Sequence, residues 1–114
     1  MKDCIFCNIV NGQIPSPRVY ETGHIIVIRD ISPKAPVHDL IIPKRHLTNF
    51  NELEDTELAG ELLLGAAKVA QIEGLAENGY RLIINTGTDG GQLVPHLHLH
   101  LLGGRNLGPK IVAD

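Results

Sequence analysis

The sequence lacks the apolar stretches that mark membrane and secreted proteins. No apolar run approaches the roughly 20 residues that a membrane-spanning helix needs. The beginning of the chain, Met1-Lys2-Asp3-Cys4, has no apolar region of the signal-peptide type. We therefore expect a cytoplasmic protein with no membrane partner.

An excess of positive charge is also missing. Ten Lys and Arg residues stand against 13 Asp and Glu, which gives a net charge of −3. Because proteins that bind phosphate backbones cluster Lys and Arg, this balance argues against a nucleic-acid partner, and any anion site must be local. The 114 residues suffice for a single domain spanning 1–114. A dimer would supplement the modest surface that so short a chain buries.

Cysteine is scarce, and the two cysteines are close together. Cys4 and Cys7 form a C-x-x-C pair. This spacing is compatible with half of a metal site, with a redox pair, or with two small apolar residues. The pair alone leaves these three interpretations open.

Apolar periodicity predicts an α+β domain. Short β-branched and apolar runs predict five strands, at 19–21, 25–29, 38–43, 81–85 and 96–102. One helix is predicted from a cap at Asp55 or Thr56 to about Glu73, with Gly74 as its stop. Its apolar stripe is Leu58, Leu62, Ala66, Val69 and Ala70. Strands on both sides of one main helix favour an antiparallel sheet over a doubly wound α/β fold.

Three histidines alternate with leucines in the last predicted strand. His96, His98 and His100 share one face, while the intervening leucines face the other way. Successive histidines are then about 6.5–7 Å apart, so they suit different atoms of one extended ligand. A solvated polar face is one interpretation. A metal site is a second, although few carboxylates that could support a metal lie nearby in the sequence. Nucleophilic attack on phosphorus by a neutral imidazole is the third.

A glycine-rich loop strengthens the third interpretation. Asp89-Gly90-Gly91-Gln92 comes shortly before the histidines. Such a loop can present backbone N–H groups to an anion, and phosphoryl transfer needs donors for the charge that develops. We therefore expect Gly91 and Gln92 to contribute to a phosphate site.

The run HLHLHLL fits the signature of the histidine-triad family, in which three histidines alternate with apolar residues. The chain resembles most closely the Hint branch of that family, the purine nucleoside phosphoramidases. The resemblance covers nearly the whole chain through segments in the expected order, among them IPSPRVYE, RDISPKAPVHDLIIPKRH, GYRLIIN, DGGQ and HLHLHLLGGR. It implies the histidine-triad fold, a homodimer with a continuous sheet, and AMP or GMP as the nucleotide part of the substrate.

The resemblance also implies a role for individual residues. His98 matches the nucleophile that forms a covalent nucleotidyl-histidine, and His100 matches the contact to the phosphate and bridging atom. His96 and His38 match supporting histidines. Asn85 matches a phosphate contact and Asp30 the carboxylate on the ribose hydroxyls. The apolar slot for the base matches Ile5, Phe6, Ile9, Ile28 and Ile31, for which core packing is the alternative interpretation.

Two departures from the Hint pattern carry chemical content. Leu93 stands where those members usually have a serine that touches the phosphate and the leaving group. The C-x-x-C pair is absent from many of them, whereas other members with this beginning bind zinc. The ligands then match Cys4, Cys7, His46 and His96, a normal structural zinc set. The resemblance implies that catalysis itself requires no cofactor.

The sequence thus predicts a hydrolase of purine nucleoside phosphoramidates or acyl-nucleotides such as aminoacyl adenylates. Three alternatives remain: a dinucleoside polyphosphate hydrolase or nucleotidyl transferase, a nucleotide-binding scaffold with residual catalysis, and a zinc store or sensor that uses the same histidines.

Overall fold

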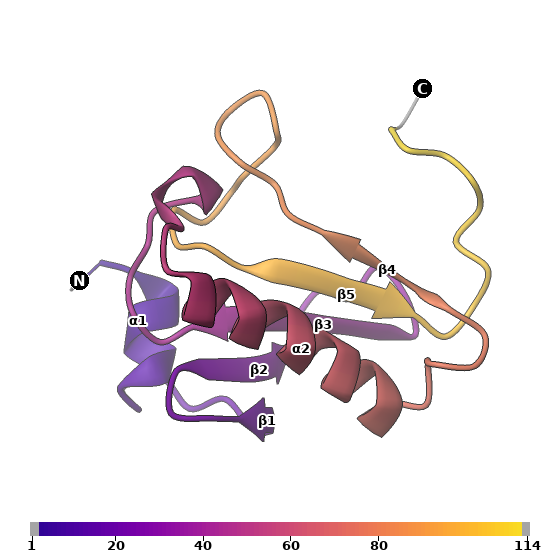
Figure 1. The fold of residues 1–114 in the computed structure, drawn as a ribbon, viewed down its shortest axis with the longest axis horizontal. Coiled ribbons are helices and arrows are strands. Elements are labelled where there is room, and N and C mark those ends of the chain that lie inside the picture. Colours follow the sequence, from indigo (N-terminus) through magenta and orange to yellow (C-terminus); the bar gives the residue numbers. More distant parts are fainter. Residues whose placement is uncertain (1–2, 113–114) are drawn as a thin grey trace.

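The computed structural model describes residues 3–112, so the ends of the predicted 1–114 domain, 1–2 and 113–114, lie outside the described residues. Five strands form one antiparallel sheet in the order β1-β2-β3-β5-β4 (Figure 1). This confirms the predicted sheet with one main helix. In chain order the elements are α1 (Ile5–Val10), β1 (Arg18–Glu21), β2 (Ile25–Arg29), β3 (Val37–Pro43), a 3-10 helix (Phe50–Glu52), α2 (Thr56–Ile72), β4 (Tyr80–Ile83) and β5 (Leu99–Gly103).

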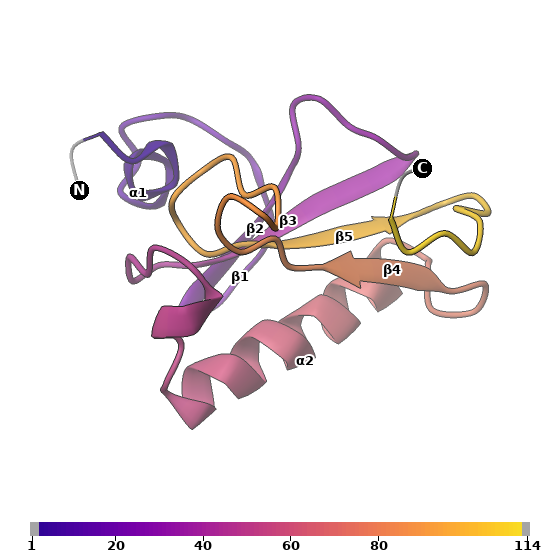
Figure 2. The same cartoon turned by 90° about the horizontal axis from the view of Figure 1, so that it is seen from above.

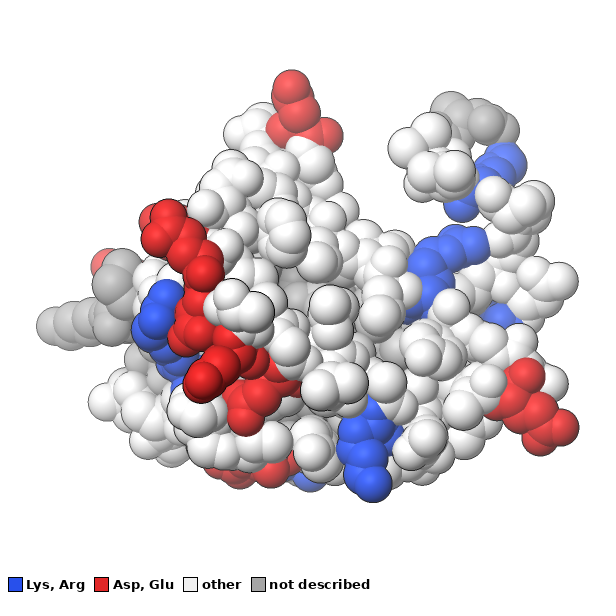
Figure 3. Space-filling model, in the orientation of Figure 1, with Lys and Arg blue, Asp and Glu red and all other residues white. Residues whose placement is uncertain are grey.

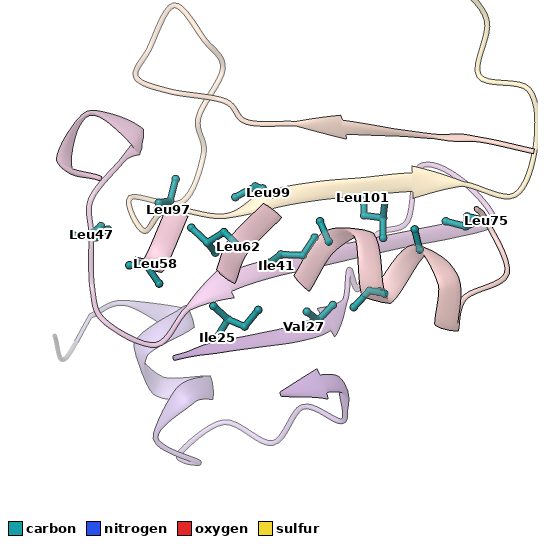
Figure 4. Close-up of a cluster of buried hydrophobic side chains, with 13 residues drawn as sticks. Ile25, Val27, Ile41, Leu47, Leu58, Leu62, Leu75, Leu97, Leu99 and Leu101 are labelled. Carbon is teal, nitrogen blue, oxygen red and sulfur yellow. The ribbon is translucent and has the colours of Figure 1, made fainter. Parts of the chain in front are cut away.

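The sheet separates two apolar clusters, because alternate side chains of each strand point to opposite faces. The helix α2 covers one face and the short helix α1 lies on the other side (Figure 2). Beneath α2, strand residues such as Val27, Ile41 and Leu99 pack against Leu62 and its neighbours (Figure 4). The smaller cluster joins α1 to the other face and consists of Cys4, Phe6, Ile9, Ile26, Ile28, Leu40 and Ile42.

The main helix follows its sequence signals closely. The Asp55 side chain accepts hydrogen bonds from the N–H groups of Glu57 and Leu58, as an N-cap does. All five residues of the predicted apolar stripe are buried. Gly74 has a φ of +75°, the left-handed conformation in which helices commonly end.

The last strand differs from its prediction. It begins at Leu99, so the expectation of a strand from residue 96 is wrong for its first three residues. Leu97 donates its N–H to the carbonyl of Leu47, in the connection after β3, instead of joining the sheet. The alternation nevertheless persists, because Leu97 belongs to the cluster beneath α2 while His96 and His98 contact Phe6 on the other side.

The face that carries α2 is acidic around the beginning of that helix, and its middle is almost without charged side chains (Figure 3). None of the helices within residues 3–112 is long and apolar enough to cross a bilayer.

Candidate functional site

Four histidines from distant parts of the chain meet on the face of the sheet opposite α2. His38 lies on β3 and His100 on β5. Nε2 of His38 is 2.9 Å from Nδ1 of His100. The His98 ring lies 5.0 Å from the His100 ring, centroid to centroid. His98 and His96 are joined through a hydrogen bond to the main chain. All four predicted histidines therefore belong to one site.

Backbone groups determine which nitrogen of His98 carries the proton. Nδ1 of His98 lies 2.7 Å from the carbonyl oxygen of His96. Because a carbonyl only accepts, Nδ1 must be the donor, and the neutral ring keeps its lone pair on Nε2. The same logic applies to His96, whose Nε2 lies 2.9 Å from the carbonyl oxygen of Pro43. The lone pair of His96 is therefore on Nδ1.

A second pair of tautomers follows from the main chain of Lys34. Its N–H donates to Nδ1 of His38 over 3.1 Å, so the neutral His38 ring carries its proton on Nε2. The N–H at Nε2 of His38 donates a hydrogen bond to Nδ1 of His100. Neutral His100 consequently has its proton on Nε2. A lone pair on His98 and an N–H donor on His100 thus stand side by side.

Burial favours the neutral form of His100 and His38. It lowers the pKa of His100 to about 4, with the neighbouring His98 and His38 acting in the same direction and Asp30 against them. Burial also lowers the pKa of His38, and Asp30, whose Oδ2 lies 3.6 Å from Nε2 of His38, opposes the shift. At neutral pH, His100 and His38 are therefore uncharged.

Phe6 connects the histidines to α1. Its ring stands edge-on to His96 at 5.7 Å and to His98 at 5.1 Å between centroids. Such T-shaped contacts stabilise the orientation of the rings. The family resemblance placed Phe6 in an apolar slot for the base, and its contact with the histidines was not predicted, because C-I-F-C-N-I-V is too short for its period to identify a helix.

The predicted nucleotide contacts differ in their degree of exposure. Ile9 and Ile28 are buried in the smaller cluster, whereas Ile5 is exposed and Ile31 is 96% exposed. Asp30 accepts the N–H of Ser32 through Oδ1 and turns Oδ2 towards His38.

The glycine-rich loop is closed by its own hydrogen bonds. The Asn85 side chain donates to the carbonyl of Gly90. The N–H groups of Gly91 and Gln92, which we expected to face an anion, donate within the loop to Thr88 and Gly87. The Gln92 side chain also holds the loop, since its amide donates to the carbonyls of Thr48 and Val94.

Two cysteines and two histidines form a compact cluster beside this site. Nδ1 of His96 lies 3.2 Å from Sγ of Cys4, 3.6 Å from Sγ of Cys7 and 3.1 Å from Nδ1 of His46. Sγ of Cys7 lies 3.4 Å from Nδ1 of His46. With Zn–N of about 2.0 Å and Zn–S of about 2.3 Å, ligand atoms of a tetrahedral zinc lie roughly 3.3–3.8 Å apart. The four side chains therefore fit a tetrahedral metal ion with little adjustment.

Comparison with known proteins agrees with the geometry. The HIT domain model matches residues 11–107. The chain is 47% identical over 112 residues to the purine nucleoside phosphoramidase of Escherichia coli K12, covering 96% of this chain and 94% of the relative. A HIT family hydrolase from Clostridium thermocellum superposes with a TM-score of 0.94 at 47% identity, covering 98% and 99% of the two chains. A Zn-bound histidine triad family protein from Mycobacterium smegmatis superposes with a TM-score of 0.83 at 33% identity, covering 93% of this chain and 78% of that one.

Proposed function

The chain belongs to the HIT-domain family, and on that premise we propose that it is a hydrolase that releases a purine nucleoside monophosphate from an amine or acyl leaving group. The observation that carries the proposal is the pairing of two tautomers, a lone pair on Nε2 of His98 beside an N–H on Nε2 of His100. A nucleophile beside a hydrogen-bond donor suits this reaction, because the nucleophile attacks phosphorus while the donor assists the departure of a basic group.

The proposed reaction has two steps. Nε2 of His98 attacks the phosphorus and forms a phosphorus–nitrogen bond, while the bond from phosphorus to the leaving group breaks. Nε2–H of His100 donates a hydrogen bond to the leaving atom, and the leaving group departs with a proton taken from solvent. Water then attacks the nucleotidyl-histidine, the bond to His98 breaks, and the proton released by the water passes to solvent. His38 holds His100 in the required tautomer through its contact of 2.9 Å.

The remaining residues supply binding and orientation in this proposal. The carboxylate of Asp30 receives the ribose hydroxyls, and the exposed side chains of Ile5 and Ile31 cover the purine. Asn85 and the loop residues Gly91 and Gln92 border the phosphate. Buried Ile9, Ile28 and Phe6 support the site from beneath.

We further propose that zinc occupies the cluster of Cys4, Cys7, His46 and His96. The donor set and its spacing support this assignment. A zinc ion there supplies structural stability, because metal binding to a folded site is folding free energy. The two protons that neutral thiols would carry are lost on binding. No step of the hydrolysis passes through the metal.

The proposed function is tested by turnover of two substrates. We expect adenosine 5′-phosphoramidate to be hydrolysed to AMP with a kcat/KM at least about tenfold above that for diadenosine tetraphosphate, because the donor on His100 assists a nitrogen leaving group most. Chromatographic separation of the products measures both rates. Preference for the dinucleotide, or binding of AMP without turnover of either compound, would contradict the proposal.

The presence of leucine at position 93 leads to a separate prediction about which leaving groups the protein prefers. The side chain of Leu93 is 93% exposed in the loop that leads to His96 and cannot donate a hydrogen bond. Leu93→Ser should raise kcat/KM selectively for alkyl-amine phosphoramidates by about tenfold, since one hydrogen bond to a charged centre is worth roughly 1.5–3 kcal/mol at most. The matched substrate is an acyl adenylate with the same nucleotide. Equal changes on both substrates would show that residue 93 has no role in the departure of the leaving group.

We also propose that two copies pair through β4 and α2. β4 is an edge strand, with β5 as its one neighbour among the described residues. Next to it, an apolar groove of about 420 Å³ includes Leu53, Leu62, Leu63, Ile84 and Leu99 in its lining. The uncharged middle of this face in Figure 3 lies between the acidic beginning of α2 and the basic side chains near β4. A second copy would extend the sheet and cover both the edge and the groove.

The dimer predicts the effect of a charge in β4. Leu82 is 39% exposed, and Leu82→Glu should convert a dimer to a monomer at micromolar concentration, because the carboxylate would be buried without a partner. Light scattering measures the mass. Ile14→Glu is the matched control, since Ile14 is 37% exposed and precedes β1 at the opposite edge of the sheet. A parent protein that is monomeric, or two variants of equal mass, would refute the interface.

A further inference from the structure

The Cys–His cluster and the catalytic histidines share one residue and one helix. His96 turns Nδ1 to the cysteines and His46, and its carbonyl holds Nδ1 of His98. We propose that zinc in this cluster tightens purine-nucleotide binding, and that Phe6 transmits the coupling from the metal ligands to His98. The inference rests on the proposed function, because it presumes both a nucleotide at His98 and a metal at the cysteines.

The helix α1 is the first physical link. It has six residues, and helices this short are not stable by themselves. Cys4 is its N-cap and Cys7 lies in its first turns, so both cysteines bind through this element. Phe6 lies between them in the sequence and is 6% exposed, with its ring edge-on to His98. A metal that fixes α1 therefore fixes the position of the Phe6 ring against the nucleophile.

The segment before β5 is the second link. Residues 96–98 precede the regular strand, and Leu97 is tied to Leu47 instead. A metal would bind this segment through His96 and would bind the Leu47 region through the adjacent His46. One ion would thus connect three parts of the chain: α1, the connection after β3, and the segment that carries His98. Ordering these parts in advance removes an entropic cost that the nucleotide would otherwise meet on binding.

Thermodynamic linkage makes the inference quantitative. If zinc raises the affinity for AMP by a factor, AMP must raise the affinity for zinc by the same factor. Coupling of this kind typically amounts to about 5–150-fold. We expect a factor of at least about fivefold here, because the metal and the nucleophile are connected through direct contacts.

Calorimetric titration of AMP into zinc-loaded and chelator-treated full-length protein tests the proposal. Circular dichroism records whether each form is folded, and zinc affinity with and without AMP is measured by competition with a chromophoric chelator. The expected results are tighter AMP binding in the zinc form and an equal factor in the reverse experiment. Equal AMP affinity in both forms would overturn the coupling and leave the proposed function intact. Absence of AMP binding in both forms would contradict the proposed function itself. Absence of zinc binding would overturn the proposed coupling, because the coupling requires a bound zinc ion.

A variant distinguishes transmission through Phe6 from a general loss of folding. Phe6→Leu keeps an apolar side chain but removes the ring contacts with His96 and His98. In Phe6→Leu, the ratio of AMP affinities with and without zinc should fall towards one, while one zinc ion per chain remains bound. Phe50→Leu changes the only other phenylalanine, which is exposed in the 3-10 helix, and should keep the factor of the parent. An unchanged factor in Phe6→Leu would overturn the role of Phe6.

Discussion

Replacing His98 with asparagine should abolish turnover while AMP remains bound. Asparagine is polar and smaller than histidine, but it cannot form the covalent nucleotidyl intermediate. Loss of a covalent nucleophile costs orders of magnitude, so kcat should fall by on the order of a thousandfold or more. Rapid-quench kinetics with adenosine 5′-phosphoramidate measure the rate, and calorimetry measures AMP affinity.

The matched control is His24→Asn. His24 has an exposed side chain that pairs with Glu61 of α2 over 3.1 Å, on the other side of the sheet from His98. Its replacement should leave kcat within about twofold, as expected for a surface position. If His98→Asn keeps more than about a tenth of the parent activity, the assignment of the nucleophile is wrong.

Asp39→Leu should stabilise the protein strongly at pH 8. Asp39 is fully buried on β3, on the face that α2 covers, and neither carboxylate oxygen has a hydrogen-bond partner within residues 3–112. Burial, and after it the charge of Glu73 at the end of α2, raise the pKa of Asp39 to about 6, while Arg29 opposes the shift. A shift from 3.8 to about 6 corresponds to roughly 3 kcal/mol of unfolding free energy. Leucine removes that cost and adds apolar burial.

The pH dependence has a definite sign. The folded state binds the proton of Asp39 more tightly than the unfolded state, so this residue destabilises the protein progressively as pH rises from about 4 to about 6. Urea unfolding at pH 8 and pH 5 should therefore show a larger advantage for Asp39→Leu at pH 8. Glu77→Gln, which alters an exposed carboxylate, is the control and should track the parent. An advantage that does not change between the two pH values would show that the pKa of Asp39 is not raised in the folded protein.

Asp39 also shows what the sequence could and could not predict. The run H-D-L-I-I-P predicted β3 from residue 38, and because side chains alternate along a strand, Asp39 lies on the face opposite to that of His38. Alternation cannot reveal that Asp39 lies beneath the end of α2 without a partner, since that depends on how the helix crosses the sheet. The helix α2 and the strand β2 were predicted within about a residue, because each has a strong local pattern. The helix α1 was missed, because a cysteine caps it where Ser, Thr, Asp or Asn would have been a signal.

The candidate site could be predicted as a set of residues but not as an arrangement. The row of histidines followed from period-two spacing, and the cluster of Cys4, Cys7, His46 and His96 followed from family resemblance. The contact between His38 and His100 spans 62 positions and depends on the β3–β5 register, which a single sequence does not specify. The tautomers depend on backbone groups of Lys34, Pro43 and His96, for which residue type gives no signal.

Those backbone partners make the proton arrangement resistant to mutation. Every non-proline residue carries the same N–H, and every residue carries the same carbonyl, so a substitution at Lys34 or Pro43 that preserves the fold leaves the hydrogen bond to the histidine in place. Genetic drift or deliberate redesign can therefore change side chains around the site without altering which nitrogen of His98 keeps its lone pair. Under the proposed function, the histidine site is accordingly a favourable starting point for directed evolution towards new leaving groups.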